Sequence, residues 1–583
     1  MGYSKAHICQ CLSRIATIRP DSPVTIYGNR LKTGNEFVTS VISLAKELSD
    51  SGLERGDVVA IAALNSDYYL EWLLAVAYVG AIAAPLNYRW SLEEVRSAIE
   101  LVQPAMLVVD NYCGPWAAKF QKTIKFHANL ATNNNYAIRT PPPKPIELDF
   151  IQAPESIVLI CFTSGTTGKP KGVAIDHTAL IVQSLAKIAI VGYNEDDVYL
   201  HTAPLCHIGG ISSGLAMLMA RACHVFIPKF EAKSVLQAIN QNNVTSFITV
   251  PTMMADLLSF LGKTGGEGRF KSVKKILNGA GSLSDPIARA VINIFPHAKL
   301  LSAYGMTEAS SSLTFMPLPL RKNDDSYTII SHSDNRPGGT CVGKPAPHVE
   351  LQIREKAVIN SCPIGAILTR GPHVMTKYWG ENSTGFPNKG GWLNTGDMGW
   401  IDEKGNLWLL GREKDRIKTG GENVFPQEVE AILSRHPGIA GVVVVGIPDD
   451  RFTEAVIACV RVKEKWSWGG DDPHATLQLS SSLLRDYCKQ QNLSGMKIGQ
   501  AEMSLAPRLP VEALHPTLWH RRARLGLGHP LYVARSSHEL VGLDKAGQWA
   551  MKCPVQAIIR TTEAKLDQLT MIERKRGLRG ITD

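Results

Sequence analysis

Ten residues near position 163 combine glycines, hydroxyls and lysines in a way that suits the binding of phosphate groups. The segment reads Thr163-Ser164-Gly165-Thr166-Thr167-Gly168-Lys169-Pro170-Lys171-Gly172. Glycine lets the backbone turn several N–H groups toward one point, while hydroxyls and lysines add donors and positive charge. Such a loop can wrap the anionic phosphates of a nucleotide. The sequence therefore predicts a nucleotide-phosphate loop, and a glycine-rich surface turn is the alternative.

The loop differs from a Walker A loop, which opens a helix with Gly-x-x-x-x-Gly-Lys-Ser/Thr. Here Pro170 follows Lys169, and the residue before a proline is pushed away from helical geometry. The apolar run at 157–162 predicts a buried strand immediately before the loop. We therefore expect a flexible flap at the end of a strand.

Three further predicted strands lead into polar or glycine-rich turns. Strand 244–250 leads into Pro251, strand 274–277 into Gly279-Ala280-Gly281, and strand 299–302 into a turn from Ala303 to Glu308. In open α/β sheets, ligands bind beyond the carboxyl ends of the strands. A carboxylate such as that of Glu308 suits Mg²⁺, which prefers oxygen ligands. A solvated surface acid is the alternative for this residue.

Histidine and aspartate mark two more candidate positions. Strand 198–202 leads to His207 and the glycine pair that begins with Gly209, a placement that favours a pocket over an ordinary structural hydrogen bond. Asp397 ends the run 391–397, and a carboxylate can accept two hydrogen bonds at once. The segment 411–423 contains Arg412, Lys414, Lys418, Gly420 and Gly421, and a plain linker is its alternative reading.

The elements that must position these residues alternate between strand and helix patterns. Residues 8–18, 36–51, 69–79, 92–101, 177–190 and 211–220 read as helices, and 24–27, 58–63, 81–85 and 105–109 as strands. Such alternation implies a parallel α/β sheet. Residues 126–146 read as an irregular surface excursion, and 402–410 as a hairpin that turns at 403–406. Beyond it, helices at 427–435 and 480–490, strands at 442–446 and 456–462, and a loop at 466–473 predict a small α+β domain.

Bulk composition limits the possible classes of protein. A chain of 583 residues requires two or more domains. The net charge is +9, but residues 496–583 alone carry 14 Lys and Arg against 8 Asp and Glu. The rest of the chain is close to neutral, so its charge is poor evidence for nucleic-acid binding. We expect no membrane span, because the longest apolar runs are too short. Eleven cysteines without a Cys-x-x-Cys pair indicate a reducing compartment and no structural zinc.

The motifs together resemble the adenylate-forming superfamily of acyl-CoA synthetases, luciferases and peptide-synthetase adenylation domains. The resemblance runs from about residue 8 to about residue 497, with the motifs in the family's order. It implies ATP, Mg²⁺ and CoA as cofactor or co-substrates. The ATP-binding residues that it implies are Thr163, Ser164, Gly165, Thr166, Thr167, Gly168, Lys169, Lys171, Gly279, Ala280, Gly281, Tyr304, Gly305, Met306, Thr307, Asp397 and Arg412.

The resemblance also assigns individual roles. Tyr304 packs on the adenine, Thr307 contacts the α-phosphate, and Glu308 holds the magnesium. Thr307, Glu308 and Lys171 form the expected catalytic set. Asp397 and Arg412 contact the ribose. The acyl pocket takes His207, Gly209 and Gly281, the hinge is Lys414, and the CoA tunnel is lined by Lys418, Gly420 and Gly421.

The implied fold is α/β, with a large domain at 1–413 made of parallel and mixed sheets flanked by helices. A small α+β lid follows at 414–497. Residues 498–583 form an atypical tail, because relatives carry a Thr-Gly-Lys segment whose lysine binds the carboxylate and α-phosphate. No such segment occurs here, either through an altered gene model or splice form or through genuine loss. Loss of one such transition-state contact costs about 3–4 kcal/mol, so we expect weak adenylation with the thioester step retained.

The identity of the acid rests on whole-segment likeness. Residues 87–90, 162–164, 201–210, 304–309 and 342–348 look most like plant-type 2-succinylbenzoate–CoA ligases, which serve phylloquinone synthesis in plastids, with some relatives in peroxisomes. A 4-coumarate-like or medium-chain acyl-CoA ligase shares every motif. A peptide-synthetase module would need a carrier domain, and none is recognisable. A nucleotide-binding protein with impaired adenylation is the alternative of another class. The likeness implies a plastid location, with peroxisome or cytosol as alternatives; the first 20 residues are weakly transit-like and the C-terminus is no Ser-Lys-Leu signal.

Overall fold

A computed structural model of the chain divides into two compact units. The first comprises Met1–Ile330 and Thr340–Leu409, and the second comprises Ser331–Gly339 and Leu410–Asp583. The structure describes residues 6–131, 150–164, 170–264, 269–283, 285–318, 338–359, 362–380, 391–419, 422–449, 453–463, 466–468, 477–491, 502–504, 542–543 and 549–550. Within these residues, none of the helices combines the length and apolar character needed to span a lipid bilayer.

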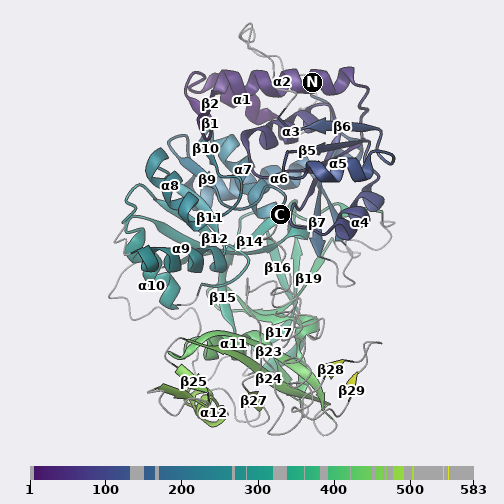
Figure 1. The fold of residues 1–583 in the computed structure, drawn as a ribbon. Helices are drawn as coiled ribbons and strands as arrows, with labels where there is room; N and C mark the ends of the chain where they lie inside the picture. The colour runs from purple at the N-terminus through teal and green to yellow at the C-terminus, as the bar shows by residue number, and fades with distance from the viewer. Residues whose placement is uncertain are drawn as a thin grey trace, which may run out of the picture. The chain divides into compact units, whose positions relative to one another are not determined.

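One sheet of the first unit contains seven strands among the described residues (Figure 1). Their spatial order is β18 (Lys377–Tyr378), β8 (Pro170–Asp176), β7 (Ile157–Ser164), β4 (Ile82–Leu86), β3 (Val58–Ala62), β5 (Met106–Val109) and β6 (Phe126–Asn129). The strands from β7 to β6 run parallel, while β8 and β18 are antiparallel to their neighbours. The parallel α/β sheet predicted from alternating strands and helices is therefore confirmed.

The second sheet of this unit is larger and mixed, with thirteen strands in the described part of the chain. Their order is β16 (Glu350–Ile359), β17 (Cys362–Arg370), β19 (Leu393–Ile401), β20 (Leu407–Arg412), β15 (Thr340–Pro345), β14 (Ser311–Leu318), β13 (Lys299–Met306), β12 (Lys275–Asn278), β11 (Ser246–Thr249), β9 (Val198–His201), β10 (Cys223–Phe226), β1 (Pro23–Tyr27) and β2 (Arg30–Thr33). From β13 to β1 the strands are parallel. The predicted hairpin at 402–410 is confirmed, since β19 and β20 are neighbours joined by a short turn.

Helices cover both faces of the smaller sheet and of the parallel part of the larger one. Helices α1 (Gln10–Thr17), α2 (Gly34–Asp50), α3 (Asp67–Tyr78), α6 (His177–Lys187) and α7 (Ile208–Ala220) share a core with one face of the seven-stranded sheet. Helices α4 (Leu92–Val102) and α5 (Gly114–Phe120) pack on its other face. Helices α6 and α7 also pack on the larger sheet, whose opposite face is covered by α8 (Ala232–Asn242), α9 (Pro251–Thr264) and α10 (Asp285–Ile294) (Figure 1). Helices α6 and α7 thus contribute to the cores of both sheets.

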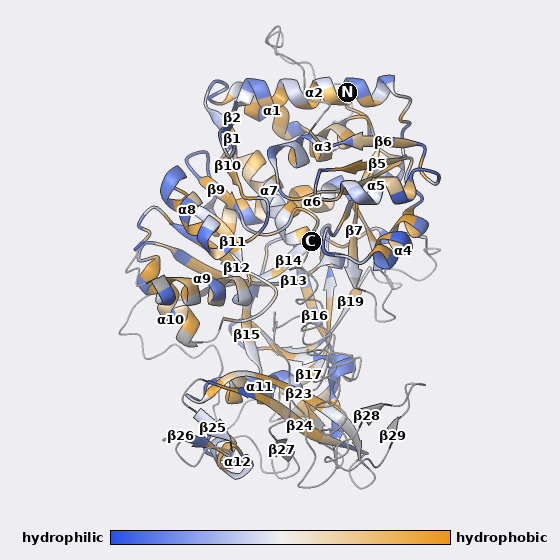
Figure 2. Cartoon of the chain, in the orientation of Figure 1, coloured by the Kyte–Doolittle hydropathy of each residue, from blue (hydrophilic) through white to orange (hydrophobic). Residues whose placement is uncertain are grey.

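Local sequence explains where these helices begin and which side they bury. Thr33 and Ser91 each form a capping box with the glutamate three residues on, and Asp176 accepts from the N–H of Ala179 at 2.7 Å. Such caps satisfy backbone donors that the first helical turn leaves unpaired. Along α2, hydrophobic and hydrophilic residues alternate around the axis (Figure 2). Its buried side includes Phe37 and Val41, as its helical spacing predicts.

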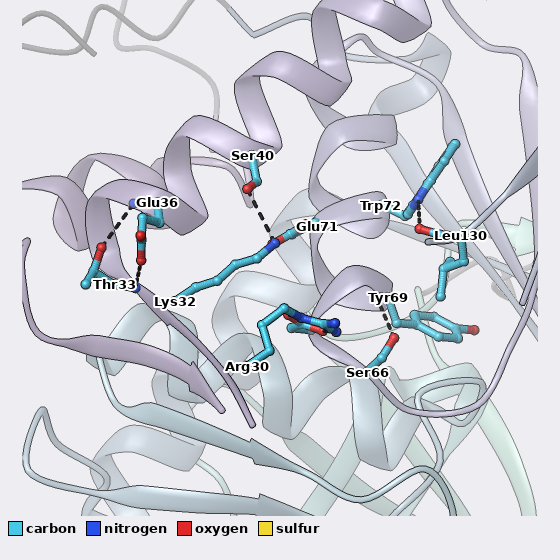
Figure 3. Close-up of polar contacts among 11 residues, drawn as sticks. Arg30, Lys32, Thr33, Glu36, Ser40, Ser66, Tyr69, Glu71, Trp72 and Leu130 are labelled. Carbon is cyan, nitrogen blue, oxygen red and sulfur yellow. Dashed lines mark hydrogen bonds and ion pairs between the residues drawn. The ribbon is translucent and has the colours of Figure 1, made fainter. Parts of the chain in front are cut away.

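Two ion pairs attach the β1–β2 hairpin to α3 (Figure 3). Arg30 makes a bidentate contact with Asp67, at 2.8 Å from Nε and 2.5 Å from Nη2. Lys32 Nζ lies 2.5 Å from Oε1 of Glu71, whose side chain is fully buried. Burial raises the pKa of Glu71 to about 7, against the opposing effect of the Lys32 charge. The hairpin is therefore held by charges as well as by apolar packing.

Two tryptophans stack across the β19–β20 hairpin. The ring centroids of Trp400 and Trp408 lie 5.2 Å apart with an interplanar angle of 10°. The indole N–H of Trp408 donates to Asp402 at 2.9 Å, and Asp402 also accepts from the backbone of Asn406. Both rings are buried, so the pair fixes the hairpin that carries Asp397 on its first strand.

The second unit contains a small mixed α+β core. Its main sheet pairs β21 (Ile417–Thr419), β22 (Glu422–Val424), β23 (Ile439–Asp449), β24 (Thr453–Val462) and β27 (Glu502–Ser504). Helices α11 (Pro426–Leu433) and α12 (Ser481–Gln490) share its hydrophobic core, which includes Val429 and Leu484. Two short strand pairs complete the described elements: β25 (Trp466–Trp468) with β26 (Leu477–Leu479), and β28 (Gly542–Leu543) with β29 (Trp549–Ala550).

Four predictions about local structure were wrong. The segment 126–129 forms β6 at the sheet edge, and 466–468 forms β25; both strands are too short for their period to be read. Helix α6 ends at Lys187 and continues as a π-helix, η3 (Ile188–Gly192). Residues 303–306, predicted as part of a turn, extend β13, because the antiparallel partner β14 supplies hydrogen bonds that sequence periodicity does not reveal. The excursion predicted at 132–146 lies outside the described residues.

Candidate active site

The predicted phosphate loop is the connection of the β7–β8 hairpin. Thr163 pairs with Lys171 and Ser164 with Pro170 across the two strands. The predicted contacts of Gly165, Thr166, Thr167, Gly168 and Lys169 fall outside the described residues, as does the side chain of Ser164. Lys171 is described and half-buried. It therefore stands beside the loop that joins the two strands, opposite Thr163.

Lys171 and Glu308 meet at the ring of Tyr378. The Nζ atom of Lys171 lies 4.8 Å from the centroid of that ring. The Tyr378 hydroxyl donates to Oε1 of Glu308 at 2.9 Å, and the backbone N–H of Met375 donates to the Glu308 carbonyl at 2.9 Å. A cation, a phenol and a carboxylate from three separate segments thus come together. Tyr378 carries no signal in the sequence, because it lies on a two-residue strand without any recognisable pattern.

Thr307 and Glu308 lie on a short 3₁₀ turn, η4 (Thr307–Ala309), between β13 and β14. At Gly305 the two strands approach so closely that a Cβ would overlap the carbonyl of Ser311. The position consequently requires glycine. Met306 and Gly305 lead directly into the turn, so the backbone that carries Thr307 and Glu308 is fixed by β-sheet pairing on both sides.

Tyr304 and Asp397 are joined by a hydrogen bond. The phenol of Tyr304 donates to Oδ2 of Asp397 at 2.6 Å. Asp397 lies on β19 and is buried, and its backbone N–H donates to the hydroxyl of Thr395 at 3.1 Å. The two residues are 93 positions apart in sequence, and nothing in the sequence indicated this pairing. The residues predicted for adenine and ribose contact are therefore direct neighbours.

Gly279, Ala280 and Gly281 follow β12, as predicted. The N–H of Gly279 donates to the carbonyl of Thr249 at 2.9 Å, and the Asn278 side chain donates to that of Gly281 at 2.7 Å. Ala280 has a positive φ of 59°. A Cβ at Gly279 would meet no atom within 4 Å. The tripeptide is therefore held from one side while its first residue faces open space.

His207 is the residue that precedes helix α7. Its side chain is accessible to solvent although protein atoms surround it closely. Burial among those atoms, together with the charge of Arg89, lowers the pKa of His207 to about 4. A Cβ at Gly209 would meet Ile248 at 3.7 Å, whereas one at Gly210 would overlap the carbonyl of Pro204. His207 is thus a neutral, accessible imidazole at a tight turn.

Five predicted residues belong to the second unit, and the structure describes three of them. Arg412 ends β20, Lys414 lies on the 3₁₀ turn η5 (Glu413–Asp415), and Lys418 lies on β21. The backbone N–H of Lys418 donates to Glu454 at 2.6 Å. Gly420 and Gly421 lie outside the described residues. The predicted hinge thus occupies a single short turn just after the end of β20.

Comparisons with known proteins match both halves of the chain. Residues 12–379 match the family model for AMP-binding enzymes, and residues 428–507 match the one for the AMP-binding enzyme C-terminal domain. The chain is 52% identical over 523 residues to the chloroplastic/peroxisomal 2-succinylbenzoate–CoA ligase of Arabidopsis thaliana, covering 85% of this chain and 93% of that protein.

Solved structures of a bacterial enzyme share the fold. The o-succinylbenzoate CoA synthetase of Bacillus subtilis, in complex with the acyl-adenylate intermediate OSB-AMP, matches with a TM-score of 0.69 at 26% identity, over 86% of this chain and 95% of the other. The same enzyme in complex with ATP and magnesium ion also gives 0.69 and 26%, over 86% and 96%. The predicted fold class is confirmed, and the chain belongs to the AMP-binding enzyme family.

Proposed function

We propose that this enzyme activates 2-succinylbenzoate with ATP and transfers the acyl group to CoA. The observation that carries the proposal is the convergence of Lys171, Tyr378 and Glu308 beside the β7–β8 hairpin. The choice of acid is supported by the name of the Arabidopsis relative at 52% identity and by OSB-AMP in the Bacillus complex. ATP and magnesium ion in a second complex of that enzyme support the nucleotide and the metal.

The residues present fit ATP and magnesium. Glu308 offers a carboxylate and Thr307 a hydroxyl on one turn, and Mg²⁺ is commonly held by one or two protein oxygens together with phosphates. Lys171 supplies a positive charge beside the loop that connects β7 to β8. The bond from Tyr378 orients the carboxylate of Glu308. Magnesium, when bound, would neutralise charge on the ATP phosphates.

In the first half-reaction the substrate carboxylate attacks the α-phosphorus of ATP. A phosphorus–oxygen bond forms to the acid while the bond to pyrophosphate breaks, which yields acyl-adenylate and pyrophosphate. The attacking oxygen is already ionised, so no general base is required. Thr307 and Lys171 would hold the α-phosphate in line. Positioning and charge neutralisation then provide most of the catalysis.

The nucleoside would be held by the Tyr304–Asp397 pair. The ring of Tyr304 would lie on the adenine, with Gly279, Ala280 and Gly281 as a flat backbone floor beside it. Asp397 would accept from the ribose hydroxyls, and Arg412 would provide the second ribose contact. The open space beside Gly279 supports a ligand on that side.

The acyl group would lie beside His207, Gly209 and Gly281. Since the pKa of His207 is about 4, the imidazole is neutral at physiological pH and would line the pocket without a charge. In the second half-reaction the CoA thiol attacks the acyl carbon and AMP leaves. We propose that the large domain at 1–413 bears the site and that residues 414–497 form a lid hinged at Lys414. Lys418, Gly420 and Gly421 would line the CoA tunnel.

The tail at 498–583 lacks the family's lysine motif, so we expect slow adenylation and a retained thioester step. A 4-coumarate-like or medium-chain acyl-CoA ligase remains the alternative enzyme, and a nucleotide-binding protein with impaired adenylation the alternative of another class. We propose a plastid location, from the Arabidopsis relative's description, with peroxisome or cytosol as alternatives.

The test is pyrophosphate release by the full chain with ATP, Mg²⁺ and CoA. We expect 2-succinylbenzoate to support turnover and cinnamates or medium-chain acids to support less. Turnover with cinnamates and none with succinylbenzoate would overturn the choice of acid. ATP binding by calorimetry without turnover on any acid would favour the binding protein.

A further inference from the structure

Helix α6 carries a buried glutamine that reaches the turn bearing Thr307 and Glu308. The Gln183 side chain is fully buried, and its Nε2 donates to the carbonyls of Ala309 at 2.9 Å and Ser312 at 2.8 Å. These carbonyls lie on either side of Ser310 and Ser311. One amide group therefore holds both ends of the backbone step that follows Glu308.

Lys187 lies one helical turn further along α6 and reaches the same backbone. Its ammonium group is fully buried and donates to the hydroxyls of Ser212 at 2.7 Å, Ser213 at 3.1 Å and Ser311 at 3.1 Å. Ser212 and Ser213 belong to α7, which begins immediately after His207. Lys187 thus joins three elements: α6, α7 and the first residue of β14.

The backbone between these two anchors is strained. Ser310 has a φ of 54° and Ser311 a φ of 129°, both in the region that side chains other than glycine rarely adopt. Such conformations persist where surrounding contacts enforce them, and they are concentrated at functional sites. Gln183 bonds the carbonyls on either side of this step, and Lys187 bonds the Ser311 hydroxyl within it. They maintain the bend that turns the chain from η4 into β14.

Burying the polar groups of Gln183 and Lys187 costs free energy, so helix formation alone does not explain these two side chains. Desolvation lowers the pKa of Lys187 to about 7, and a buried amide is costly unless it is hydrogen-bonded. Apolar residues of similar length would fill the same space without that cost. The hydrogen bonds of the two side chains fix the positions of polar groups on neighbouring elements.

We propose that Gln183 and Lys187 are positioning residues that fix the Thr307–Glu308 turn relative to helix α6 and hence to the phosphate-loop hairpin. Helix α6 begins at His177, directly after β8, whose other end receives the chain from the phosphate loop. Neither residue touches the nucleotide in this assignment. They set the distance between the Thr307–Glu308 turn and the phosphate-loop hairpin, which contact the nucleotide in the proposed function. The inference rests on the proposed function, because it takes Glu308 as the magnesium contact.

The test is calorimetric binding of ATP to the full chain, with and without Mg²⁺, for Gln183→Met and Lys187→Met. Both replacements keep side-chain length and remove the donors. Changes behind a metal ligand commonly cost 10- to 100-fold in affinity, so we expect about tenfold weaker binding of Mg·ATP. Binding of metal-free ATP should weaken less than that of Mg·ATP, because metal-free ATP loses only the Thr307 contact, whereas Mg·ATP also loses Glu308, which acts through the metal. A merely structural lesion would weaken both forms alike.

Ser184→Ala is the matched control. Ser184 is buried next to Gln183, but its hydroxyl donates to Leu180 at 2.7 Å within the same helix. We expect it to leave both affinities unchanged. Ser311→Ala is a milder second variant, which removes one acceptor of Lys187. It tests the positioning role of Lys187 if Lys187→Met fails to fold. Wild-type affinity for Mg·ATP in Gln183→Met and Ser311→Ala, with wild-type melting temperatures, would overturn the proposal.

These outcomes separate the inference from the proposed function. If the wild-type chain binds Mg·ATP but forms no acyl-CoA from 2-succinylbenzoate, the proposed function fails while the binding series still tests the two residues. If the wild type turns over and the variants bind Mg·ATP normally, the positioning role fails and the function stands.

Discussion

Replacing Tyr304 by Phe tests the adenine–ribose arrangement most directly. The change keeps the ring that would stack on adenine and removes the hydroxyl that donates to Asp397 at 2.6 Å. Asp397 is buried, and its backbone N–H remains bonded to Thr395. The position of the β-strand is thereby retained. The carboxylate loses one of the contacts that fix its orientation toward the ribose.

The size of the effect follows from the kind of bond. A hydrogen bond to a charged group contributes about 1.5–3 kcal/mol. Because the variant's carboxylate can still rotate to meet the ribose, we expect the lower end, about 1.5 kcal/mol. That corresponds to roughly a tenfold rise in the KM for ATP. The turnover number should change little, since ground-state and transition-state complexes bind the ribose alike.

The assay compares ATP with 2′-deoxy-ATP in wild type and Tyr304→Phe, by initial rates of pyrophosphate release. If the phenol acts through Asp397 on the ribose, the tenfold effect seen with ATP should shrink with the deoxy nucleotide. Tyr193→Phe is the control, because the buried Tyr193 hydroxyl finds no hydrogen-bond partner among the described residues. Equal effects of Tyr304→Phe on both nucleotides, or no effect on either, would refute the reasoning.

Three other predictions concern the phosphate site, the two half-reactions and the buried Glu71. Tyr378→Phe should lower the rate of adenylation roughly tenfold, because it removes the hydrogen bond that orients the Glu308 carboxylate. Lys171→Ala and Glu308→Ala should lower the rate more, and none of the three changes should alter the melting temperature. Equal turnover by the wild type and the three variants would contradict the phosphate assignment. With a synthetic acyl-adenylate and CoA, thioester formation should proceed faster than adenylation does from free acid, because the tail lacks the lysine motif; comparable failure of both half-reactions argues against this division. Glu71 should make stability depend on pH: its native pKa of about 7 lies above its ordinary 4.5, so its contribution is fully present below about pH 4.5 and is lost as pH rises through 7. From pH 5 to 8, the free energy of unfolding of the wild type should fall about 2–3 kcal/mol relative to Glu71→Gln, by denaturant titration; parallel curves would show that Glu71 ionises normally.

The sequence predicted the parallel part of the fold well because its signals are local. Helix α2 has a capping box at Thr33 and Glu36 and an apolar stripe, and strands such as β3 are continuous apolar runs. Short edge strands such as β6 have too few residues to show the alternation of buried and exposed side chains that predicts a strand. The extension of β13 through Tyr304 depends on β14, which no pattern within residues 299–308 reveals.

The candidate site was predictable where motifs are contiguous and not where the chain assembles it from distant parts. Lys171, Glu308 and Asp397 were found by motif. Tyr378, which contacts both Lys171 and Glu308, was not, because a tyrosine on a two-residue strand looks like any other. Gln183 was read as part of an ordinary helix, since only its distance to Ala309 and Ser312 distinguishes it. Pairings across roughly 70 to 130 positions require the tertiary structure.

The stacked Trp400–Trp408 pair supplies an intrinsic optical reporter for the strand that carries Asp397. Two indoles whose ring centroids lie 5.2 Å apart are close enough to couple their electronic transitions, and coupled transition dipoles that are twisted relative to each other give a split circular-dichroism band. Loss of that band on heating or on nucleotide addition would report separation of β19 from β20 without any label. Each variant of Tyr304 or Asp397 could thus be checked for a native hairpin in the cuvette used for its binding curve.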